Sequence, residues 1–130
     1  MAEQGPERPP CILLTFGHKH GPPPAADLLL DARILPNPYW VESLRDHSGL
    51  ESRVAAHALD NPIGRQFIDL LLPLLCFVLQ QTEEAGRKPP CIAIGCTGGR
   101  HRSVALAEEL RRRLQAEGWP ATVIHRDILQ

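Results

Sequence analysis

The stretch AIGCTGGRHRSV, residues 93–104, joins a short apolar run to an amphipathic segment. The run CIAIG at 91–95 is typical of a buried strand. Within 103–117 leucines recur at every fourth position, which predicts a helix with one apolar stripe. A thiol, two glycines and three basic side chains lie between these two elements. The sequence therefore predicts a strand, a glycine-rich loop and a helix in direct succession.

Further apolar runs on both sides of this unit predict the rest of the fold. Because strands and helices alternate along the chain, we expect one α/β layered domain with a small, mostly parallel sheet flanked by helices. Residues 1–10 are polar and proline-rich and are expected to form a flexible tail, which leaves 11–130 as the domain. The other predicted strands lie at 11–16, 27–35 and 121–126, and the other predicted helices at 41–47, 50–59 and 62–84.

Composition and charge exclude several classes of protein. The chain has 130 residues and a net charge of −1, so nothing attracts it as a whole to nucleic acid or to a membrane. The N-terminus has no signal-peptide pattern. The apolar run 67–79 is too short for a bilayer, and we expect it in a core helix that Pro73 bends or begins. The prediction is a cytoplasmic protein without membrane contact.

The cysteines and histidines form no recognisable metal site. No two cysteines have C-x-x-C spacing, and His18 with His20 lacks a second ligand pair. Most of the cysteines lie in apolar runs, where a free thiol behaves as a small hydrophobic group. We therefore expect no metal, no cofactor and reduced thiols at Cys11, Cys76, Cys91 and Cys96.

A glycine-rich loop at a helix N-terminus is a natural site for an anion, because the first backbone N–H groups of a helix lack internal acceptors and the helix dipole is positive there. Gly98 and Gly99 let the backbone approach the anion closely, and Arg102 can donate two parallel hydrogen bonds to a phosphate. The predicted phosphate-binding residues are Cys96, Thr97, Gly98, Gly99, Arg100, His101, Arg102 and Ser103.

The same spacing supports an alternative with chemistry. C-x-x-G-x-x-R-S, residues 96–103, resembles the phosphate loop of cysteine-dependent phosphatases, in which Cys96 would attack phosphorus and Arg102 would hold the oxygens. However, Gly95 stands where a histidine usually precedes that cysteine. Candidate general acids are suggested by residue type alone, so binding without reaction is the favoured interpretation; the candidates are Asp46, Asp60 and Asp127.

Two long motifs, DARILPNPYW at 31–40 and AIGCTGGRHRSV at 93–104, resemble the C-terminal domain of the RapZ family of RNase adapter proteins, also called YvcJ-type nucleotide-binding proteins. The resemblance covers nearly the whole chain from Cys11 onward. Shorter matches are TFGHKHG at 15–21, HSGLESRVAAHAL at 47–59 and VIHRD at 123–127.

This resemblance implies a cytoplasmic regulatory domain without catalysis, similar in fold to a sugar-phosphate-binding subdomain of phosphofructokinase. It implies that the ligand is glucosamine-6-phosphate. It also implies that the domain binds small regulatory RNAs and presents them to an RNase. We further expect a homodimer. The residues Thr97, Gly98, Gly99, His101 and Arg102 would hold the phosphate. The sugar side would be lined by Asp31, Arg33, Asn37 and Tyr39.

The chain also departs from the family's pattern. It lacks the N-terminal P-loop domain, so we expect a free-standing module that hydrolyses no nucleotide. Tyr39 stands where a histidine is expected in members that sense the amino sugar. The chain ends in DILQ without a basic tail, so we expect at most weak, salt-sensitive RNA binding.

Internal charges agree with weak RNA binding. The run RRR at 111–113 follows Glu108 and Glu109, and we expect pairs four residues apart, Glu108 with Arg112 and Glu109 with Arg113, on a solvated helix. A better candidate for an RNA patch is the loop after the first strand, which we expect at the same sheet edge as the phosphate loop; the alternative is a solvated loop without a ligand. That patch is His18, Lys19 and His20, whereas the tryptophans Trp40 and Trp119 are expected to pack against the core.

Overall fold

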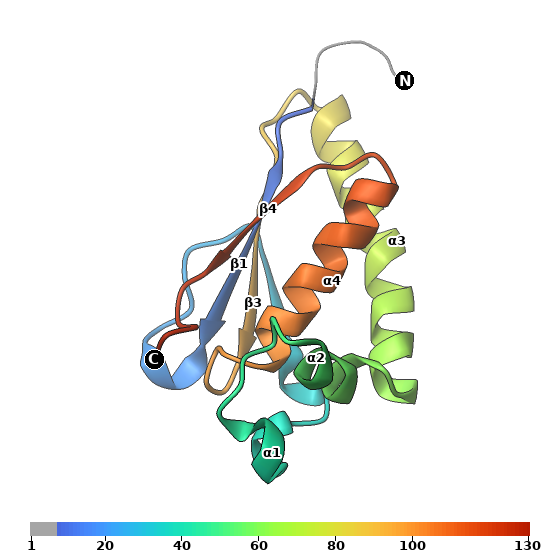
Figure 1. Ribbon diagram of the computed structural model, residues 1–130. Coiled ribbons are helices and arrows are strands. Elements are labelled where there is room, and N and C mark those ends of the chain that lie inside the picture. The colour runs from blue at the N-terminus through green and yellow to red at the C-terminus, as the bar shows by residue number, and fades with distance from the viewer. Residues whose placement is uncertain (1–7) are drawn as a thin grey trace.

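All neighbouring strands of the sheet run parallel in the computed structural model, which describes residues 8–130 (Figure 1). This confirms the predicted α/β domain with a small parallel sheet. The strands lie in the order β2-β3-β1-β4. They are β1 (Cys11–Gly17), β2 (Leu28–Asp31), β3 (Cys91–Cys96) and β4 (Ala121–His125).

The helices cover one face of this sheet (Figure 1). Helix α4 packs directly on β1, β3 and β4, and α3 packs beside α4. Leu106, Leu110 and Leu114 of α4 are fully buried, as their spacing predicts. The helices are α1 (Glu42–Arg45), α2 (Ser52–Leu59), α3 (Pro62–Glu84) and α4 (Arg102–Ala116), and short 3₁₀ turns are η1 (His18–His20), η2 (Ala32–Ile34) and η3 (Pro38–Trp40).

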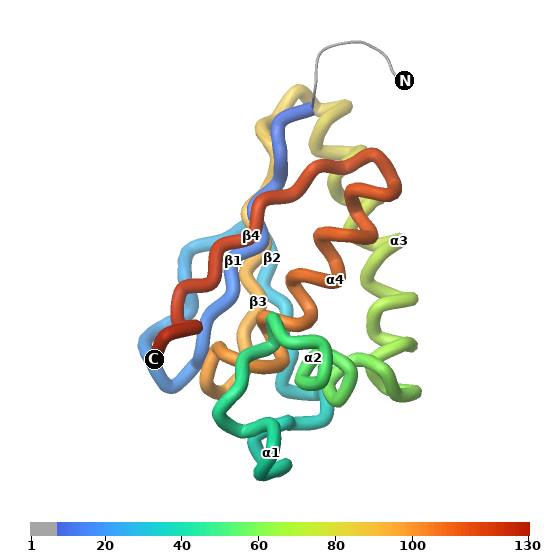
Figure 2. The backbone as a smooth tube through the Cα atoms, viewed as in Figure 1, coloured from blue at the N-terminus to red at the C-terminus, as the bar shows by residue number. Residues whose placement is uncertain are grey.

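The register of the sheet brings two loops together. Gly17, the last residue of β1, lies opposite Cys96, the last residue of β3. The chain leaves both strands at the same end of the sheet, where the two loops lie side by side (Figure 2). This is the carboxyl edge, at which open α/β sheets bind their ligands.

Two predicted elements are shorter in the structure. The strand predicted at 27–35 ends at Asp31, because the Asp31 carboxylate accepts the Arg33 N–H at 2.9 Å and caps the turn η2. The helix predicted at 41–47 is reduced to one turn, α1. Helix α3 begins at Pro62 behind its cap Asn61, as predicted, and continues through Pro73, so that proline does not begin it.

Helix α3 extends beyond both ends of the apolar run 67–79. Among residues 8–130, α3 is the one helix that is long and apolar enough, by length and composition, to cross a membrane. One stripe of it packs into the common core of the layered domain, as expected of a soluble α/β protein. The buried residues of this stripe are Gly64, Ile68, Leu71, Leu75 and Leu79.

The two tryptophans behave differently. Trp119 packs against the core, and the guanidinium of Arg8 lies 4.0 Å from its ring centre. Trp40 is 76% exposed, so the prediction that it packs in the core is wrong. It is the last residue of the short turn η3, which begins at Pro38 rather than in a regular core element. All four cysteines are free.

The expected tail at 1–10 falls, for residues 1–7, outside the described residues. Its end is held to the domain. Arg8 donates hydrogen bonds to Glu83 at 2.8 Å and to the Gly118 carbonyl at 2.9 Å.

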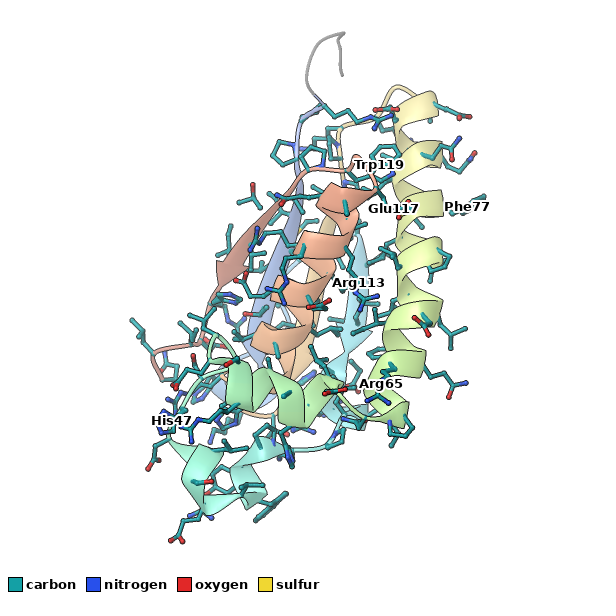
Figure 3. The ribbon with its side chains drawn as sticks, turned by 45° about the vertical axis from the view of Figure 1, so that its right-hand side comes forward. His47, Arg65, Phe77, Arg113, Glu117 and Trp119 are labelled. Atoms are coloured by element: carbon teal, nitrogen blue, oxygen red, sulfur yellow. The ribbon has the colours of Figure 1, made fainter. Side chains whose placement is uncertain are left out.

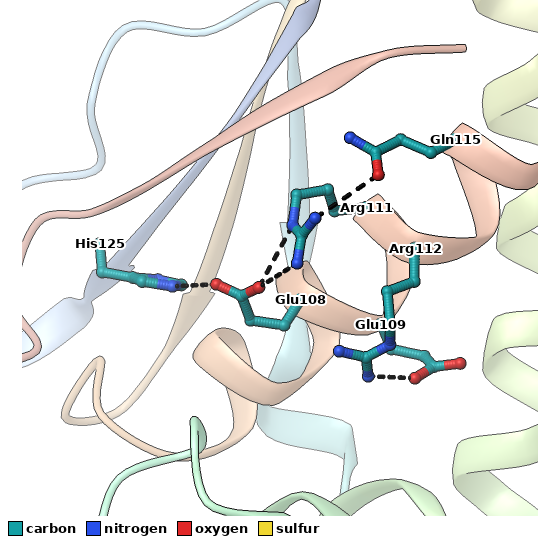
Figure 4. Close-up of polar contacts among 6 residues, drawn as sticks. All are labelled: Glu108, Glu109, Arg111, Arg112, Gln115 and His125. Carbon is teal, nitrogen blue, oxygen red and sulfur yellow. Dashed lines mark hydrogen bonds and ion pairs between the residues drawn. The ribbon is translucent and has the colours of Figure 1, made fainter. Parts of the chain in front are cut away.

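A polar cluster joins β1, β4 and α4, and Figure 4 shows its contacts between His125 of β4 and the residues of α4. His125 Nδ1 lies 2.8 Å from Thr15 Oγ1, and its Nε2 lies 2.8 Å from Glu108. Glu108 also accepts from Arg111, so the predicted Glu108–Arg112 pair is wrong. Burial alone would raise the pKa of Glu108, but the hydrogen bonds from His125 and Arg111 outweigh burial and lower it.

The remaining arginines of the RRR run stay paired with acids. Glu109 accepts from Arg113 at 2.7 Å, as predicted, and it also pairs with Arg112. All three guanidinium groups at 111–113 are therefore matched by carboxylates on their own helix. This arrangement is typical of a solvated helix surface.

Candidate anion-binding site

A cavity of about 550 Å³ opens at the carboxyl edge of the sheet, where the loops after β1 and β3 meet. It combines residues from five separate segments of the chain. The lining residues are Lys19, His20, Asn37, Tyr39, Trp40, Arg45, Asp46, Cys96, Thr97, Gly98, Arg100, His101, Arg102 and Gln130. Most of the loop predicted from the sequence therefore faces one cavity.

Two glycines let the loop lie directly on the end of β1. Gly99 has φ +76°, a left-handed conformation, and a Cβ at this position would lie 2.5 Å from the Gly17 nitrogen. A Cβ on Gly17 would lie 2.4 Å from the Gly98 carbonyl carbon. The two backbones are thus in contact, and only glycine fits at either position.

Gly98 has a different surrounding. The nearest atom to a Cβ built on Gly98 is Lys19 Cε at 3.8 Å, and its φ is not left-handed. The position is open because it faces the cavity. The fold itself does not require glycine at position 98. The missing side chain instead leaves space in the cavity for a ligand.

Several backbone N–H groups of the loop are free to bind a ligand. The Gly99 N–H donates to Cys96 Sγ at 3.3 Å. Within residues 8–130, the N–H groups of Gly98, Arg100 and His101 donate to no protein acceptor. They immediately precede α4, so the positive end of its dipole adds to their attraction for an anion.

Arg102 holds the loop to the segment after β2. Its Nη1 donates to the carbonyls of Arg33 at 2.9 Å and Leu35 at 3.3 Å, and its Nη2 donates to Thr97 Oγ1 at 3.2 Å. In the described part of the chain, Arg102 Nε is the one buried side-chain nitrogen or oxygen without a hydrogen-bond partner. Unpartnered buried donors are rare, and a bound anion would supply the missing acceptor.

The other two basic residues of the loop hold it to neighbouring segments. Arg100 donates to the carbonyls of Asp46 at 3.1 Å and Ile128 at 3.3 Å. His101 Nε2 lies 3.0 Å from the Arg45 carbonyl. Burial lowers the pKa of His101, against the opposing effect of that carbonyl, so the ring is neutral at pH 7. A neutral ring that bonds a carbonyl through Nε2 donates from that atom.

The charge of the cavity is positive although the chain as a whole is not. Its lining includes the cationic side chains of Lys19, Arg45, Arg100 and Arg102 and a single acidic side chain, that of Asp46. Burial lowers the pKa of Arg102, but an arginine keeps its charge at any physiological pH. Cations in a concave, partly desolvated site raise the local concentration of anions.

Cys96 lies at the bottom of this loop and is only 2% exposed. Its Sγ lies 3.2 Å from Ser103 Oγ and accepts the Gly99 N–H. The thiol therefore lies among hydrogen-bonding groups, yet it is covered by the loop that it supports.

Of the three candidate general acids, Asp46 alone lines the same cavity as this thiol. Asp46 lines the cavity, whereas Asp60 pairs with Arg65 at 2.5 Å in a separate groove. Burial alone would raise the pKa of Asp127, but hydrogen bonds from Arg126 and from the Gly17 N–H at 2.8 Å outweigh burial and lower it. Asp127 is therefore ionised at pH 7 and has no proton to donate.

The predicted sugar-side residues fall into two groups. Asn37 and Tyr39 line the cavity, and Asn37 Oδ1 accepts the Tyr39 N–H at 3.1 Å. Asp31 and Arg33 are not among its lining residues and form an ion pair with each other at 2.9 Å. Of the predicted RNA patch, Lys19 and His20 line the cavity, and His18 does not.

Sequence reasoning missed an aromatic and cationic wall. Trp40, Arg45 and Gln130 line the cavity without having been predicted there, and Asp46 had been named only as a candidate general acid. The rings of Tyr39 and Trp40 meet edge to face at 5.1 Å, and the guanidinium of Arg45 lies 5.0 Å from the Tyr39 ring centre. A useful signal was present, because the PNP stretch at 36–38 marks a turn and the two aromatic residues follow it directly.

A larger groove of about 810 Å³ lies between α2, α3 and α4. Its arginines are matched by acids, Arg65 by Asp60 and Arg113 by Glu109. Among the described residues, those that line this groove include no glycine-rich loop. The N-terminus of α4, at Arg102, is not among them either. The smaller cavity at the sheet edge is therefore the better candidate for an anion.

Comparison with known proteins agrees with the sequence motifs. A family model described as the RapZ C-terminal domain matches residues 11–129. A nucleotide-binding protein from Frankia alni is 42% identical over 128 residues, which cover 98% of this chain and 44% of that protein. Nucleotide-binding proteins from Streptomyces coelicolor and Moorella thermoacetica are 42% and 43% identical over 118 residues, 91% of this chain and 40% of each relative. The chain thus spans about two fifths of the length of these relatives.

Proposed function

Since the chain belongs to the RapZ C-terminal domain family, we propose that it is a regulatory module that binds a phosphorylated metabolite at residues 96–103. One observation carries the proposal. The loop presents free N–H groups at a cavity lined by four cations, and one of these, Arg102, has a buried Nε without an acceptor. A phosphate ester supplies both the charge and the acceptors that this arrangement lacks.

The rest of the cavity suggests a sugar phosphate. Asn37 can exchange hydrogen bonds with hydroxyl groups, and the exposed rings of Tyr39 and Trp40 offer an apolar face to a pyranose. Asp46, the single lining carboxylate, can pair with an ammonium group. A phosphorylated amino sugar such as glucosamine-6-phosphate has all three features.

We place the module in the cytoplasm and assign it no cofactor, metal or membrane contact. RNA is a possible second ligand, since Lys19 and His20 line the same cavity. The arginines at 111–113 are paired with acids, so RNA binding by this chain alone is expected to be weak and salt-sensitive. No part of the proposal requires nucleotide hydrolysis.

Gly98→Ala tests the proposal without disturbing the fold. The new methyl group points into the cavity, so we expect affinity for glucosamine-6-phosphate to fall by about 1–3 kcal/mol, the usual penalty for crowding a filled site. The melting temperature without ligand should change little, because the backbone at Gly98 is not left-handed. Calorimetric titration measures the first quantity and thermal unfolding the second.

A control variant is available in the same chain. Gly86 lies in the turn before β3, at the end of that strand opposite the loop, and has no atom within 4 Å of a built Cβ. Gly86→Ala should leave the affinity unchanged. Equal affinities for the parent and Gly98→Ala would remove the loop from the binding site.

Cys96→Ser separates a binding module from a phosphatase. A phosphocysteine pathway needs a nucleophile with open access and an acid to protonate the leaving oxygen. Cys96 is covered, Asp127 is ionised and Asp60 lies in a separate groove, which leaves Asp46 as the one candidate acid at the cavity. We expect Cys96→Ser to bind the sugar phosphate as the parent does, and the parent to release no phosphate from p-nitrophenyl phosphate. Vanadate-sensitive release that disappears in Cys96→Ser would favour the enzyme instead.

A further inference from the structure

Two charged residues after β4, Arg126 and Asp127, contact the end of β1. The Asp127 carboxylate accepts the Gly17 N–H at 2.8 Å and pairs with the guanidinium of Arg126 at 2.9 Å. That guanidinium also lies 5.3 Å from the ring centre of Phe16. Asp127 is only 4% exposed, so its charge depends on both hydrogen-bonding partners. The pair therefore fixes the point at which the chain leaves β1.

Arg126 also spans the loop that follows β1, which contains η1. Its Nη1 donates to the Pro22 carbonyl at 2.8 Å, beyond the end of η1. Its Nη2 lies 3.5 Å from the Gly17 carbonyl, just before η1 begins. A Cβ built on Gly21 would lie 3.7 Å from the same Nη2. One guanidinium group thus bridges both ends of the loop 17–22.

The turn η1 depends on polar contacts of this kind because it contributes nothing to the core. None of its three residues is buried. Its backbone is joined to the glycine-rich loop by a hydrogen bond from the Lys19 N–H to the Thr97 carbonyl at 3.1 Å. The ring of His18 packs edge to face against Phe16, with ring centres 4.9 Å apart. A short exposed turn with few anchors opens at a low cost in free energy when one of them is lost.

The turn carries part of the cavity wall. Lys19 and His20 line the cavity, and Lys19 is one of its four cations. Asp127 contacts the glycine-rich loop as well, since a Cβ built on Gly99 would lie 3.0 Å from Asp127 Cβ. Arg126 and Asp127 are not themselves among the lining residues. The pair therefore contacts both loops of the site without reaching the space that a ligand would occupy.

We propose that Arg126 and Asp127 are positioning residues of the anion site, which hold η1 and its cavity-lining side chains beside the loop 96–103. The inference rests on the proposed function, because it requires an anion at that loop. A lysine has a long, flexible stem, so the charge of Lys19 is effective at the anion only where its backbone is fixed. Arg126 fixes that backbone through carbonyls on both sides of η1, and Asp127 fixes it through an N–H at the end of β1.

Arg126→Gln tests the role of the guanidinium in binding. Glutamine cannot reach Asp127 and both carbonyls at once. We expect the affinities for glucosamine-6-phosphate and for inorganic phosphate to fall on the order of tenfold, as when an outer partner that orients a ligating group is removed. Calorimetric titration is done below the melting temperature of the variant. Should Arg126→Gln not fold, Arg126→Lys keeps the charge without the fork and should lose affinity in the same direction.

Arg8→Gln is the matched control. Arg8 makes the same kinds of contact as Arg126, with a carboxylate, with a backbone carbonyl and with an aromatic ring, that of Trp119. Figure 3 shows Trp119 and His47 at opposite ends of the molecule, and His47 directly follows the cavity-lining Asp46. Arg8→Gln should therefore leave the affinity for both phosphate probes unchanged.

A double-mutant cycle with Lys19→Ala separates positioning from a general loss of stability. Lys19→Ala alone should lower the affinity about tenfold, which corresponds to one charge-assisted hydrogen bond. If Arg126 acts through η1, the double variant loses clearly less than the roughly hundredfold product of two independent effects. A full product would show that Arg126 does not act through Lys19 and would overturn the proposal.

Amide hydrogen exchange supplies a second readout that needs no ligand. The Lys19 N–H donates to the Thr97 carbonyl and should exchange about tenfold faster in Arg126→Gln than in the parent, while the amides of α4 keep their rates. An unchanged Lys19 rate would overturn the positioning role, as would an unchanged affinity or an equal loss of affinity in Arg8→Gln. A parent that binds neither phosphate probe would refute the proposed function itself, and the exchange rates would then decide separately whether Arg126 holds η1.

Discussion

Gly99→Ala is expected to lower the free energy of unfolding by about 2–5 kcal/mol. Two effects add at this position. The left-handed backbone, φ +76°, costs a residue with a side chain about 1–2 kcal/mol. The new methyl would lie 2.5 Å from the Gly17 nitrogen and 2.8 Å from the Phe16 carbonyl carbon, and relieving such an overlap adds about 1–3 kcal/mol.

Gly86→Ala isolates the first of these effects. Gly86 has nearly the same backbone conformation, φ +71°, but no atom within 4 Å of a built Cβ. It should lose only the conformational part, about 1–2 kcal/mol. Urea denaturation followed by circular dichroism gives both values. If Gly99→Ala loses no more than Gly86→Ala, the close contact between the loop and β1 does not exist in solution.

Arg102→Ala is expected to weaken binding of a phosphate ester by about 1.5–3 kcal/mol, the usual contribution of a hydrogen bond to a charged group. The same change removes the donor shared by the Arg33 and Leu35 carbonyls, so the free energy of unfolding should fall as well. Calorimetric titration must therefore be done well below the melting temperature of the variant.

Arg102→Lys separates charge from geometry. Lysine keeps the positive charge but cannot donate from a fork to two carbonyls, a hydroxyl and a ligand together. Its affinity should fall between those of the parent and Arg102→Ala. Parent-like affinity in Arg102→Ala, with folding confirmed, would show that the ligand binds elsewhere.

The sequence allowed the fold and the central loop to be predicted because both depend on local patterns. Leucines four residues apart in 103–117 gave α4, and Asn61 followed by Pro62 gave the start of α3. The glycines and basic residues between β3 and α4 pointed to an anion site. Each of these signals is contained within a few adjacent residues.

The remaining features depend on partners distant in sequence. Glu108 prefers His125 and Arg111 to the predicted Arg112, because β4 brings His125 to α4. The bonds from Arg102 to carbonyls 67 and 69 residues away could not be read from any local pattern. Trp40 was assigned to the core by residue type, but tertiary structure places it at the cavity.

The most direct test of the proposed function is an NMR titration of the ¹⁵N-labelled chain with glucosamine-6-phosphate. The account predicts saturable shifts that are largest for the backbone amides of Gly98, Arg100 and His101, which have no protein acceptor, and a clear shift of the Arg102 Nε resonance. Glucosamine without the phosphate should leave these signals in place. Shifts confined to the groove between α2, α3 and α4, or no saturable shift in the loop, would contradict a phosphate site at residues 96–103.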